Sequence, residues 1–368
     1  MTFNDNGQSI NLAASQPVFG HEAFDDHEKV IFLSDKDTGL KAIIAIHNTV
    51  LGPALGGVRM WDYANENEAL KDALRLSKGM TYKAAITGLN LGGGKAVILG
   101  NSNTQKSPEL ITKFAESVHS FAGTYITTED VGTDPFDMDL IRQTTPYVTG
   151  ISEESGGAGN PASISAFGVF MGMKAAAQLK YGSEVLEDKL IYVQGAGKVG
   201  EALIENLVNE GARVIISDIN QERLEHVSSM YDVDIYRGDD IYSEVMDIYA
   251  PCALGATLND ITIPKLKASI VAGCANNQLQ NEDSHGRLLH NRGILYAPDF
   301  LINAGGLINV YGELENYDRR EVMRKTENIY NTTLEILKRA ERNNICTTTA
   351  ATNFAKERID ARRLEQNT

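Results

Sequence analysis

Hydrophobic and polar positions in the first part of the chain predict a mixed α/β arrangement. Residues 29–34 and 40–47 are apolar, β-branched runs separated by a turn-forming cluster, and they predict a β-hairpin. Over residues 65–83, apolar side chains recur at three- and four-residue spacing, which predicts a helix. The glycine run 92–94 cannot continue that helix, and the apolar residues 95–99 predict a buried strand.

After the helix expected over residues 163–181, the pattern changes to strands that alternate with helices, which is typical of a parallel sheet. The preceding stretch 150–160, GISEESGGAGN, is rich in glycine and serine and predicts the boundary between two domains. Further strands and helices are expected along the chain at residues 108–121, 125–128, 163–181, 190–194, 213–217, 247–252, 269–273, 294–297, 319–343 and 354–363.

A glycine-rich turn joins the first strand of the predicted parallel sheet to a helix. The turn GAGKVG follows strand 190–194 and precedes a helix that runs to about residue 209. Such glycines let the backbone approach a pyrophosphate, which binds at the helix N-terminus. The cofactor-binding candidates in this turn are Gly195, Gly197, Lys198, Val199 and Gly200.

A carboxylate follows the second strand of the same unit. Asp218 lies 21 residues after Gly197, directly after strand 213–217, where a carboxylate binds ribose hydroxyls and repels a 2′-phosphate. We therefore predict that the cofactor is NAD rather than NADP. Arg223 lies close enough in the sequence to leave NADP as the alternative.

The length and the two patterns together predict the fold class. At 368 residues the chain is too long for one ordinary core and suggests two domains. We predict an α/β fold with an N-terminal α/β catalytic domain and a Rossmann-type dinucleotide-binding domain, separated by a cleft. The first is expected to comprise residues 1–149, completed by about 345–368, and the second residues 150–344.

Composition narrows the possible partners. The formal charge of -15 argues against a surface that binds nucleic acid or an anionic membrane. No apolar run approaches the roughly 20 residues needed to span a bilayer, and the N-terminus lacks the features of a signal peptide, so the cytoplasm is the expected location. The three cysteines lie far apart and the histidines show no ligand spacing, so we expect neither disulfides nor a metal.

Two lysines flank the glycine run, Lys83 near the end of the helix and Lys95 at the start of the strand. At one small cleft, like-charge repulsion and burial would lower the pKa of both ammonium groups. A neutral lysine could then exchange protons while its charged neighbour held a carboxylate. An ordinary pair of surface lysines is the alternative that these residues alone leave open.

An acidic pair follows the predicted strand 125–128. Glu129 and Asp130 stand at the end of that strand, which is a plausible position for a catalytic carboxylate. Residues of this type also cap helices, so the pair has a structural alternative.

Taken together, these stretches resemble the Glu/Leu/Phe/Val dehydrogenases, the NAD(P)-dependent amino acid dehydrogenases, and most of all the leucine dehydrogenase branch. The resemblance covers residues 52–362 and is carried by the motifs GPALGGVRM, SKGMTYKAA, LNLGGGK, TTEDVGT, GNPAS, VQGAGKVG, CANNQL and LINAGGLINV. It implies reversible, NAD-dependent oxidative deamination of branched-chain L-amino acids to 2-oxo acids and ammonia, without a metal. It also implies a homo-oligomer, which is an octamer in the leucine branch.

The resemblance implies roles for individual residues. Lys83 is implied to hold the substrate α-carboxylate, Lys95 to polarise the carbonyl or its hydrated form, and Asp130 to exchange protons with the amine and water. The other residues that the resemblance places at the substrate or the cofactor are Gly56, Gly57, the stretch 303–306, Ser165, Asn276 and Asn277. The two asparagines also have a simpler interpretation as turn residues.

The resemblance further implies an apolar pocket for the substrate side chain. Glutamate dehydrogenases carry a lysine where Leu55 stands and a serine where Val310 stands, so glutamate is an unlikely substrate here. Leucine, valine and isoleucine differ by single methylenes, each worth about 1–3 kcal/mol. Thr128 and Leu307 depart from the leucine branch in a way that could shift the preference toward valine. A phenylalanine dehydrogenase and a non-catalytic NAD-binding regulator are the alternative functions.

Overall fold

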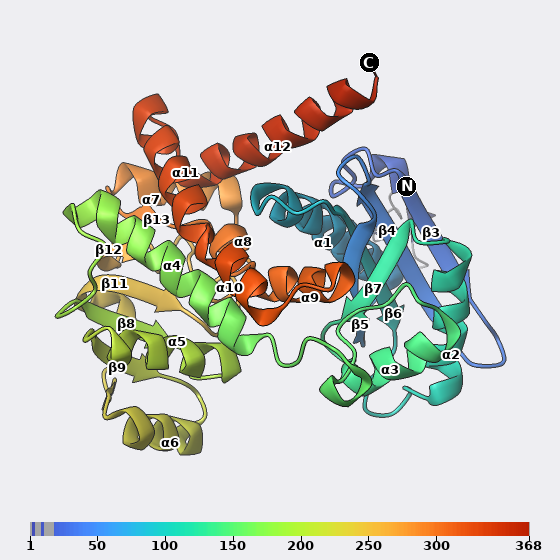
Figure 1. Cartoon of the computed structure of the whole chain (residues 1–368), viewed down its shortest axis with the longest axis horizontal. Coiled ribbons are helices and arrows are strands. Elements are labelled where there is room, and N and C mark those ends of the chain that lie inside the picture. Colours follow the sequence, from blue (N-terminus) through green and yellow to red (C-terminus); the bar gives the residue numbers. More distant parts are fainter. Residues whose placement is uncertain (1, 4–8, 11–17, 368) are drawn as a thin grey trace. The chain divides into compact units, whose positions relative to one another are not determined.

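The computed structural model describes residues 2–3, 9–10 and 18–367, and Figure 1 shows its elements. The expectation that there is no signal peptide rests on the first 16 residues, most of which lie outside this described part. The chain divides into two compact units. One contains residues 1–81 and 91–151, and the other contains residues 82–90 and 152–368.

The first unit is built on a mixed five-stranded sheet with the strand order β3-β4-β6-β5-β7. β4 pairs antiparallel with β3, as the predicted hairpin requires, and also with β6, while β5 runs parallel to β6 and β7. A short antiparallel pair, β1 with β2, precedes the sheet in the chain. The strands are β1 (Thr2–Phe3), β2 (Ser9–Ile10), β3 (Lys29–Ser34), β4 (Lys41–Asn48), β5 (Ala54–Trp61), β6 (Gly92–Leu99) and β7 (Tyr125–Glu129).

Helices cover both faces of this sheet (Figure 1). α1 packs on one face, in an apolar cluster that includes Leu74 and Val97. α2 and α3 pack on the other face, in a cluster that includes Phe114 and Met138. Burial of apolar surface on both sides therefore holds the sheet in place. The helices are α1 (Glu66–Ile86), α2 (Pro108–Ser120) and α3 (Pro135–Thr144).

The strand predicted from residue 95 begins three residues earlier, so the glycine run 92–94 belongs to β6. A Cβ on Gly92 would lie 1.9 Å from the backbone oxygen of Asn48, and one on Gly93 would lie 2.2 Å from the backbone nitrogen of Thr81. Close packing therefore requires glycine here and overrides its low strand propensity. Lys95 lies inside the strand, as its fourth residue, rather than at the strand mouth.

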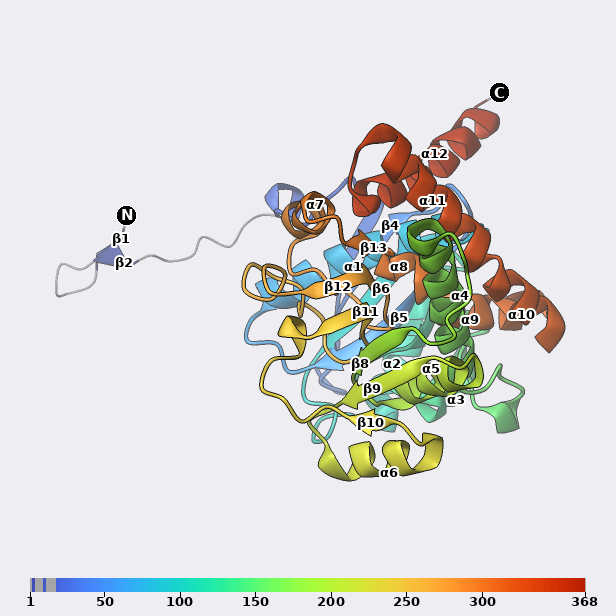
Figure 2. The same cartoon turned by 90° about the vertical axis from the view of Figure 1, so that its left-hand side faces the viewer.

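The second unit is built on a parallel six-stranded sheet with the order β10-β9-β8-β11-β12-β13, seen in Figure 2. Numbered from its first strand, this order is 3-2-1-4-5-6, the doubly wound arrangement of Rossmann folds. The predicted two-domain α/β class is confirmed. The strands are β8 (Leu190–Gln194), β9 (Arg213–Ser217), β10 (Asp234–Ile235), β11 (Val245–Pro251), β12 (Lys267–Val271) and β13 (Leu295–Tyr296).

The helices of the second unit include one correction to the predicted pattern. The single helix expected over residues 319–343 is broken at Asn328 into α10 and α11. α10 packs on α9 and α4, whereas α11 packs on α4 and α12, so the two halves follow different neighbours. No glycine or proline marks the break in the sequence. The helices are α4 (Ala162–Tyr181), α5 (Lys198–Asn209), α6 (Gln221–Tyr231), α7 (Glu282–Asn291), α8 (Asp299–Ile302), α9 (Gly305–Glu315), α10 (Arg319–Glu327), α11 (Ile329–Asn343) and α12 (Thr347–Gln366).

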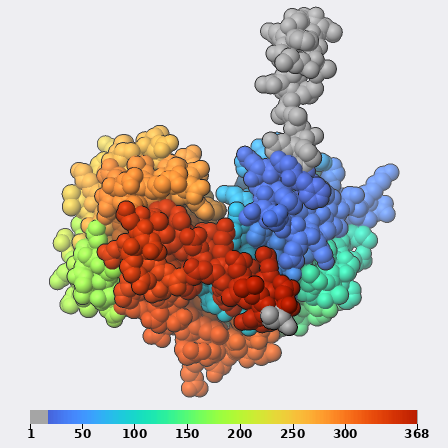
Figure 3. Space-filling view, turned by 90° about the horizontal axis from the view of Figure 1, so that it is seen from above, coloured from blue at the N-terminus to red at the C-terminus, as the bar shows by residue number. Residues whose placement is uncertain are grey.

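The C-terminal helix α12 packs on α7 and α11, and Figure 3 shows the red C-terminal helices against the orange segment that contains α7. Its Arg358 donates hydrogen bonds to the backbone oxygens of Ala85 (3.1 Å) and Leu89 (2.8 Å). A cation at these carbonyls satisfies acceptors that a helix end leaves without partners. This contact explains why residues 82–90 group with the second unit.

The observed division differs from the predicted domain limits at the C-terminus. The contacts of α12 group residues 345–368 with the second unit, whereas we expected them to complete residues 1–149. The change between the units at residues 151–152 lies within the glycine- and serine-rich stretch predicted as a boundary. The functional limits of the two domains stay a prediction. Within residues 2–3, 9–10 and 18–367, no helix is long and apolar enough to cross a membrane.

Two buried histidines lie next to each other in the first unit. The rings of His27 and His47 meet edge to face, with centroids 4.8 Å apart. His47 Nδ1 lies 2.8 Å from the hydroxyl of Thr81, and His27 Nε2 lies 2.9 Å from the backbone oxygen of Leu74. Burial, followed by the charge of His27, lowers the pKa of His47 from 6.5 to about 4.

We predict that His47 destabilises the first unit as the pH falls from 6.5 to 4. Its pKa is lower in the folded than in the unfolded chain, so its contribution is complete above pH 6.5 and is lost as the unfolded chain takes up the proton. The loss should reach about 3 kcal/mol. Urea unfolding of the wild type and of His47→Gln at pH 7 and pH 4.5 measures it. An equal loss in both proteins would contradict this assignment.

Candidate active site

Three charged side chains of the first unit meet on neighbouring strands. Lys95 lies on β6, Arg59 on β5, and Asp130 directly follows β7. The Lys95 ammonium donates a hydrogen bond to Asp130 Oδ2, and Arg59 Nε donates to Asp130 Oδ1 at 3.0 Å. Each oxygen of this carboxylate therefore has its own cation. The structure brings the predicted pair Lys95 and Asp130 into direct contact.

Burial controls the protonation of this pair. Lys95 is only 4% exposed, and this burial lowers its pKa even though Asp130 acts in the opposite direction. Burial also favours the neutral form of Asp130, but the charges of Lys95 and Arg59 outweigh it and hold the pKa of that carboxyl below its usual range. Asp130 is therefore ionised near neutral pH, and Lys95 loses its proton more easily than a surface lysine does. Such a pair is suited to proton transfer.

The like-charge repulsion that we predicted between two lysines has another source in the structure. Arg59 is the cation whose charge lowers the pKa of Lys95. Lys83 falls within the second unit, and its predicted effect on Lys95 stays a prediction. Sequence reasoning did not single out Arg59, although it stands inside the motif GPALGGVRM. The sequence carried one indication of its role: Arg59 lies two residues after Gly57, so the two residues share one face of the strand.

Two glycines of β5 allow these groups to approach one another. A Cβ on Gly57 would lie 2.9 Å from the Cβ of Asp130. A Cβ on Gly56 would lie 1.7 Å from the backbone oxygen of Gly94, so the neighbouring strand itself requires glycine there. Their predicted contact with the substrate stays a prediction.

Leu55 and Thr128 lie beside these glycines in the first unit. Leu55 is 1% exposed on β5, and Thr128 pairs in register with Gly57 across β7. The Thr128 hydroxyl is buried and has no hydrogen-bond partner among the described residues. A Cβ on Gly150 would lie only 2.6 Å from that hydroxyl, so only glycine leaves it room. A buried hydroxyl without a partner is costly, and a bound polar group or water would relieve that cost.

The dinucleotide turn of the second unit has the predicted form, and each of its three glycines has a separate physical reason. Gly195 has a backbone φ of +110°, which favours glycine. A Cβ on Gly200 would lie 2.2 Å from the Gly195 oxygen. Among the described residues beyond its chain neighbours, a Cβ on Gly197 would have only the Arg223 guanidinium, at 3.9 Å, within contact distance. The side of the turn at Gly197 is therefore open.

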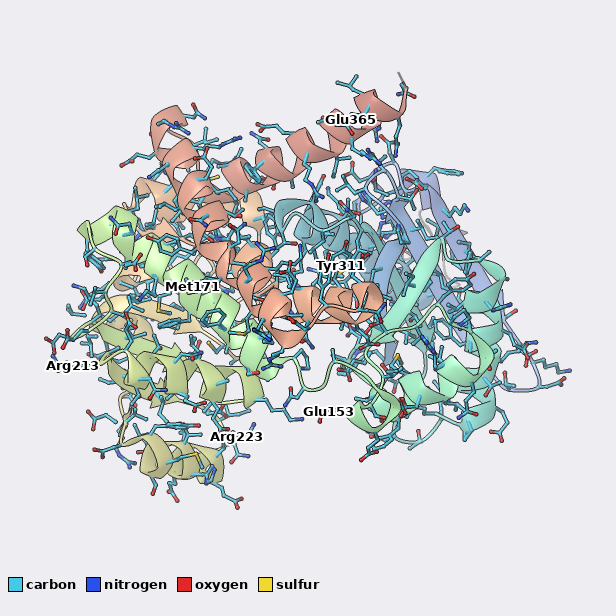
Figure 4. All side chains as sticks on the ribbon, in the orientation of Figure 1. Glu153, Met171, Arg213, Arg223, Tyr311 and Glu365 are labelled. Carbon is cyan, nitrogen blue, oxygen red and sulfur yellow. The ribbon has the colours of Figure 1, made fainter. Side chains whose placement is uncertain are left out.

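The open side of the turn faces the beginning of a helix. α5 begins at Lys198, and its N-cap residue, Gly197, has no side chain that could cap the helix. The first backbone N–H groups of the helix, including that of Val199, are therefore available to an anion. Asp218 directly follows β9, and its Oδ2 accepts the backbone N–H of Ala196 at 2.8 Å. Arg223 lies on the first turn of α6 and is labelled in Figure 4. The hydrogen bond from Ala196 thus fixes the Asp218 carboxylate next to the glycine-rich turn.

Three polar side chains of the second unit lie together. Lys83 Nζ donates to Asn276 Oδ1 at 3.4 Å, and Asn303 Nδ2 donates to the same oxygen at 2.8 Å. The side-chain oxygen of Asn303 is buried and has no hydrogen-bond partner among the described residues. Asn277 is exposed, with a φ of +52°, and its backbone oxygen accepts the N–H of Ala256, which fits its alternative interpretation as a turn residue.

The remaining predicted residues lie where α4 meets α9. A Cβ on Gly306 would lie 3.0 Å from the Ser165 hydroxyl, and one on Gly305 would lie 2.2 Å from the Ile164 oxygen. These glycines let α9 approach α4 closely. Leu307 is buried and Val310 is half-buried on α9. Within the described part of the chain, no group of three or more histidine, cysteine or acidic side chains is placed to hold a metal.

Comparisons with known proteins agree on one family. A model described as "Glu/Leu/Phe/Val dehydrogenase, dimerisation domain" matches residues 27–147, and one described as "Glutamate/Leucine/Phenylalanine/Valine dehydrogenase" matches residues 156–366. The chain is 51% identical over 334 residues to leucine dehydrogenase of Bacillus cereus, covering 91% of each chain. It is 52% identical over 338 residues to leucine dehydrogenase of Geobacillus stearothermophilus, covering 92% of each.

A solved structure with the same fold supports these matches. The L-tryptophan dehydrogenase of Nostoc punctiforme matches the chain with a TM-score of 0.82 and 44% sequence identity. The match covers 92% of this chain and 97% of that chain.

We predict that Gly197→Ala weakens dinucleotide binding without destabilising the fold. The new methyl group meets nothing closer than 3.9 Å, yet it occupies the open side of the turn. Thermal unfolding should be unchanged, while the dissociation constant for NAD, measured by calorimetry, should rise at least about tenfold. Gly200→Ala is the matched control, because its Cβ would collide with backbone and should lower thermal stability. Unchanged NAD affinity in Gly197→Ala would contradict the assignment of this turn.

Proposed function

This chain belongs to the Glu/Leu/Phe/Val dehydrogenase family, and we propose that it catalyses the NAD-dependent oxidative deamination of branched-chain L-amino acids. Leucine is the expected substrate, together with valine and isoleucine, and the products are a 2-oxo acid and ammonia. The reaction is reversible. The contact of the buried Lys95 with Asp130 carries this proposal, in a chain 51–52% identical to two leucine dehydrogenases.

The residues of the second unit fit an NAD cofactor. The open side of Gly197 and the amides at the start of α5 suit a pyrophosphate, and Asp218 suits ribose hydroxyls. The buried side-chain oxygen of Asn303, which has no partner among the described residues, suits a hydrogen-bond donor such as a carboxamide. We assign Ser165, Asn276 and Asn277 to the same cofactor. When bound, NAD accepts the hydride that leaves the α-carbon of the amino acid.

The Lys95–Asp130 pair supplies the proton transfers that the reaction needs. Ionised Asp130 accepts a proton from the substrate ammonium, so that the nitrogen lone pair can form the C=N bond as the hydride leaves. Neutral Lys95 then accepts a proton from the water that adds to the imine carbon. The resulting carbinolamine releases ammonia when the nitrogen is protonated and the hydroxyl loses its proton, which gives the 2-oxo acid. The lowered pKa of each group favours the protonation state that its step requires.

We assign substrate anchoring to Lys83 and to the glycines of β5. Lys83 Nζ is already held by the side chain of Asn276, which fixes the direction of its charge. A lysine ammonium binds a carboxylate as a point charge, as the α-carboxylate of an amino acid requires. Gly57 presents backbone rather than a side chain beside Asp130, and Gly56 does so beside the backbone of Gly94 and Lys95.

We assign the choice of side chain to Leu55, Thr128, Leu307 and Val310. Leu55 and Leu307 are almost fully buried, at 1% and 7% exposure, and neither offers a partner for a substrate carboxylate. Burying such a carboxylate without a partner would cost on the order of several kcal/mol. We therefore expect glutamate to be a poor substrate. We expect Thr128 and Leu307 to reshape this space and so to shift the preference among the three aliphatic amino acids toward valine.

We further propose a homo-oligomer, an octamer by resemblance to the leucine branch, located in the cytoplasm. Support for an oligomer comes from the first matched family model, which is described as a dimerisation domain. Light scattering, which measures the mass of the oligomer in solution, would give the number of subunits.

The function is tested by NADH formation with leucine, isoleucine, valine, phenylalanine and glutamate at mildly alkaline pH, each with NAD and with NADP. We expect fast turnover of the three aliphatic amino acids with NAD, and little with glutamate or with NADP. Faster turnover of phenylalanine would identify a phenylalanine dehydrogenase instead. Tight NAD binding without turnover of any amino acid would contradict the proposed activity and support a non-catalytic regulator.

Lys95→Ala separates binding from chemistry. We expect kcat with leucine to fall on the order of 10²–10⁴-fold, because a general acid–base group is lost. NAD affinity should be unchanged, because the dinucleotide turn belongs to the other unit. Unchanged turnover in Lys95→Ala would contradict the proton-transfer role.

A further inference from the structure

We propose that Arg59, held in turn by Asp72, is a positioning residue that keeps the Asp130 carboxylate in its reactive orientation throughout the catalytic cycle. This inference rests on the proposed function, because it concerns the same reaction. The contact of Arg59 is with Asp130, so we assign it a role that acts through this residue.

The Arg59 side chain bridges two carboxylates that come from different elements. Its Nε donates to Asp130 Oδ1 at 3.0 Å, and its Nη1 donates to Asp72 Oδ2 at 2.8 Å. The Tyr63 hydroxyl donates to the same Asp72 oxygen at 2.8 Å. Because the guanidinium group is planar and rigid, contacts at two of its nitrogens fix the direction of both bonds. β5 and α1 therefore determine together where Asp130 points.

Asp130 needs a residue that fixes the orientation of its carboxylate, because Asp130 lies in a loop. It follows the last residue of β7, and its backbone N–H donates to the Thr133 hydroxyl at 3.0 Å. The contacts of its carboxylate are the N–H of Val131 at 2.6 Å, Lys95 and Arg59. In the proposed reaction Lys95 gains and loses a proton, so its hold on Asp130 changes during each turnover. A guanidinium group keeps its protons at every working pH, and its hold is constant.

The burial of this pair distinguishes it from an ordinary surface ion pair. The side chains of Arg59 and Asp72 are 25% and 16% exposed, whereas those of the surface pair Arg362 and Glu365 are 53% and 66% exposed. Exposed pairs contribute little to structure because solvent competes with them. A partly buried arginine that contacts two acids loses more when its partner is removed. Loss of a partner of Arg59 should therefore destabilise the structure more than loss of a partner in an exposed pair does.

The charge of Arg59 also acts on both members of the proton-transferring pair. It favours the ionised form of Asp130 and disfavours the charged form of Lys95, so it lowers the pKa of both groups. Loss of this charge should therefore raise both values. Activity that needs ionised Asp130 and neutral Lys95 should then require a higher pH. The charged and titratable groups around the Asp130 carboxylate are Lys95 of β6, Arg59 of β5, Tyr63 after β5, Asp72 of α1 and Tyr125 of β7.

The test compares Arg59→Gln, Arg59→Lys and the control Arg75→Gln. Arg75 is exposed and lies 3.5 Å from the other Asp72 oxygen, so its loss removes a cation from the same acid without touching Asp130. We expect kcat with leucine to fall on the order of 10–100-fold in Arg59→Gln, with little change in KM, because the catalytic carboxylate is misplaced. The acid limb of kcat/KM should move to higher pH. Arg59→Lys should lose kcat with a smaller shift of the limb, and Arg75→Gln should resemble the wild type.

Each result bears on the inference separately from the proposed function. A wild type that oxidises no amino acid would contradict the proposed function. The inference would then be tested by the pH dependence of Lys95 acetylation with acetic anhydride, followed by peptide mass spectrometry. Arg59→Gln should shift that reactivity to higher pH, and Arg75→Gln should not. Unchanged pH dependence in Arg59→Gln, by rate or by acetylation, would overturn the inference.

Circular dichroism and thermal unfolding check that the variants fold. If Arg59→Gln does not fold, Asp72→Asn provides the same test, because it keeps Arg59 but removes the charge that aims it. We expect Asp72→Asn to lower kcat by less than Arg59→Gln does in folded protein, with KM unchanged. A wild-type kcat and pH profile in Asp72→Asn would contradict the role of Asp72 in holding Arg59.

Discussion

The contact between a buried lysine and a half-buried carboxylate is the constraint on which the first unit depends. Lys95 is 4% exposed in the middle of β6, where a lone ammonium group would be strongly unfavourable. Asp130 compensates that charge, and Arg59 in turn engages the second oxygen of Asp130. Removal of one member would leave an uncompensated charge in the interior. Sheet, loop and helix must therefore hold three charges in register, and the same arrangement makes proton exchange possible near neutral pH.

Glycine makes this arrangement possible in both units. In the first, Gly56 and Gly57 let β5 pass close to β6 and to Asp130, and in the second, Gly200 lets α5 start directly over the turn at Gly195. Gly197 is different, because within the part of the chain that the structure describes no backbone beyond its chain neighbours lies within contact distance of its missing side chain. Packing explains Gly56, Gly57 and Gly200, whereas Gly197 leaves open the space that we assign to the dinucleotide. This distinction cannot be made from the sequence, where all four look alike.

The sequence predicted most of the fold because its local signals agree with its tertiary contacts. The strand 190–194, the strand 213–217 and the two-domain class were all correct. The predictions from the sequence were wrong where tertiary contacts determine the structure. β6 begins at Gly92 rather than at residue 95, because packing against α1 and β4 overrides the low strand propensity of glycine. The helix predicted over residues 319–343 is broken at Asn328. The grouping of α12 with the second unit is likewise a result of long-range contacts, which no local pattern encodes.

Of the candidate site, the sequence pointed to Lys95 and Asp130, the proposed proton-transferring groups, but not to the residues that hold them in place. Lys95 and Asp130 stand in recognisable motifs, whereas the partners of Arg59 are Asp72 of α1 and Asp130 after β7, which come from two other elements of the chain. Repulsion from Arg59 was missed for the same reason. The effect of one charge on the pKa of another group can be recognised only when the positions of the elements that carry both groups are known.

The most direct test of the central claim is a double-mutant cycle on Lys95 and Asp130. The values of kcat/KM for leucine would be measured in the wild type, Lys95→Ala, Asp130→Ala and the double variant. If the two residues act as one proton-transferring unit, the double variant should be no slower than the slower single variant. If the two losses multiply, the residues act independently, and the account given for this pair would be wrong.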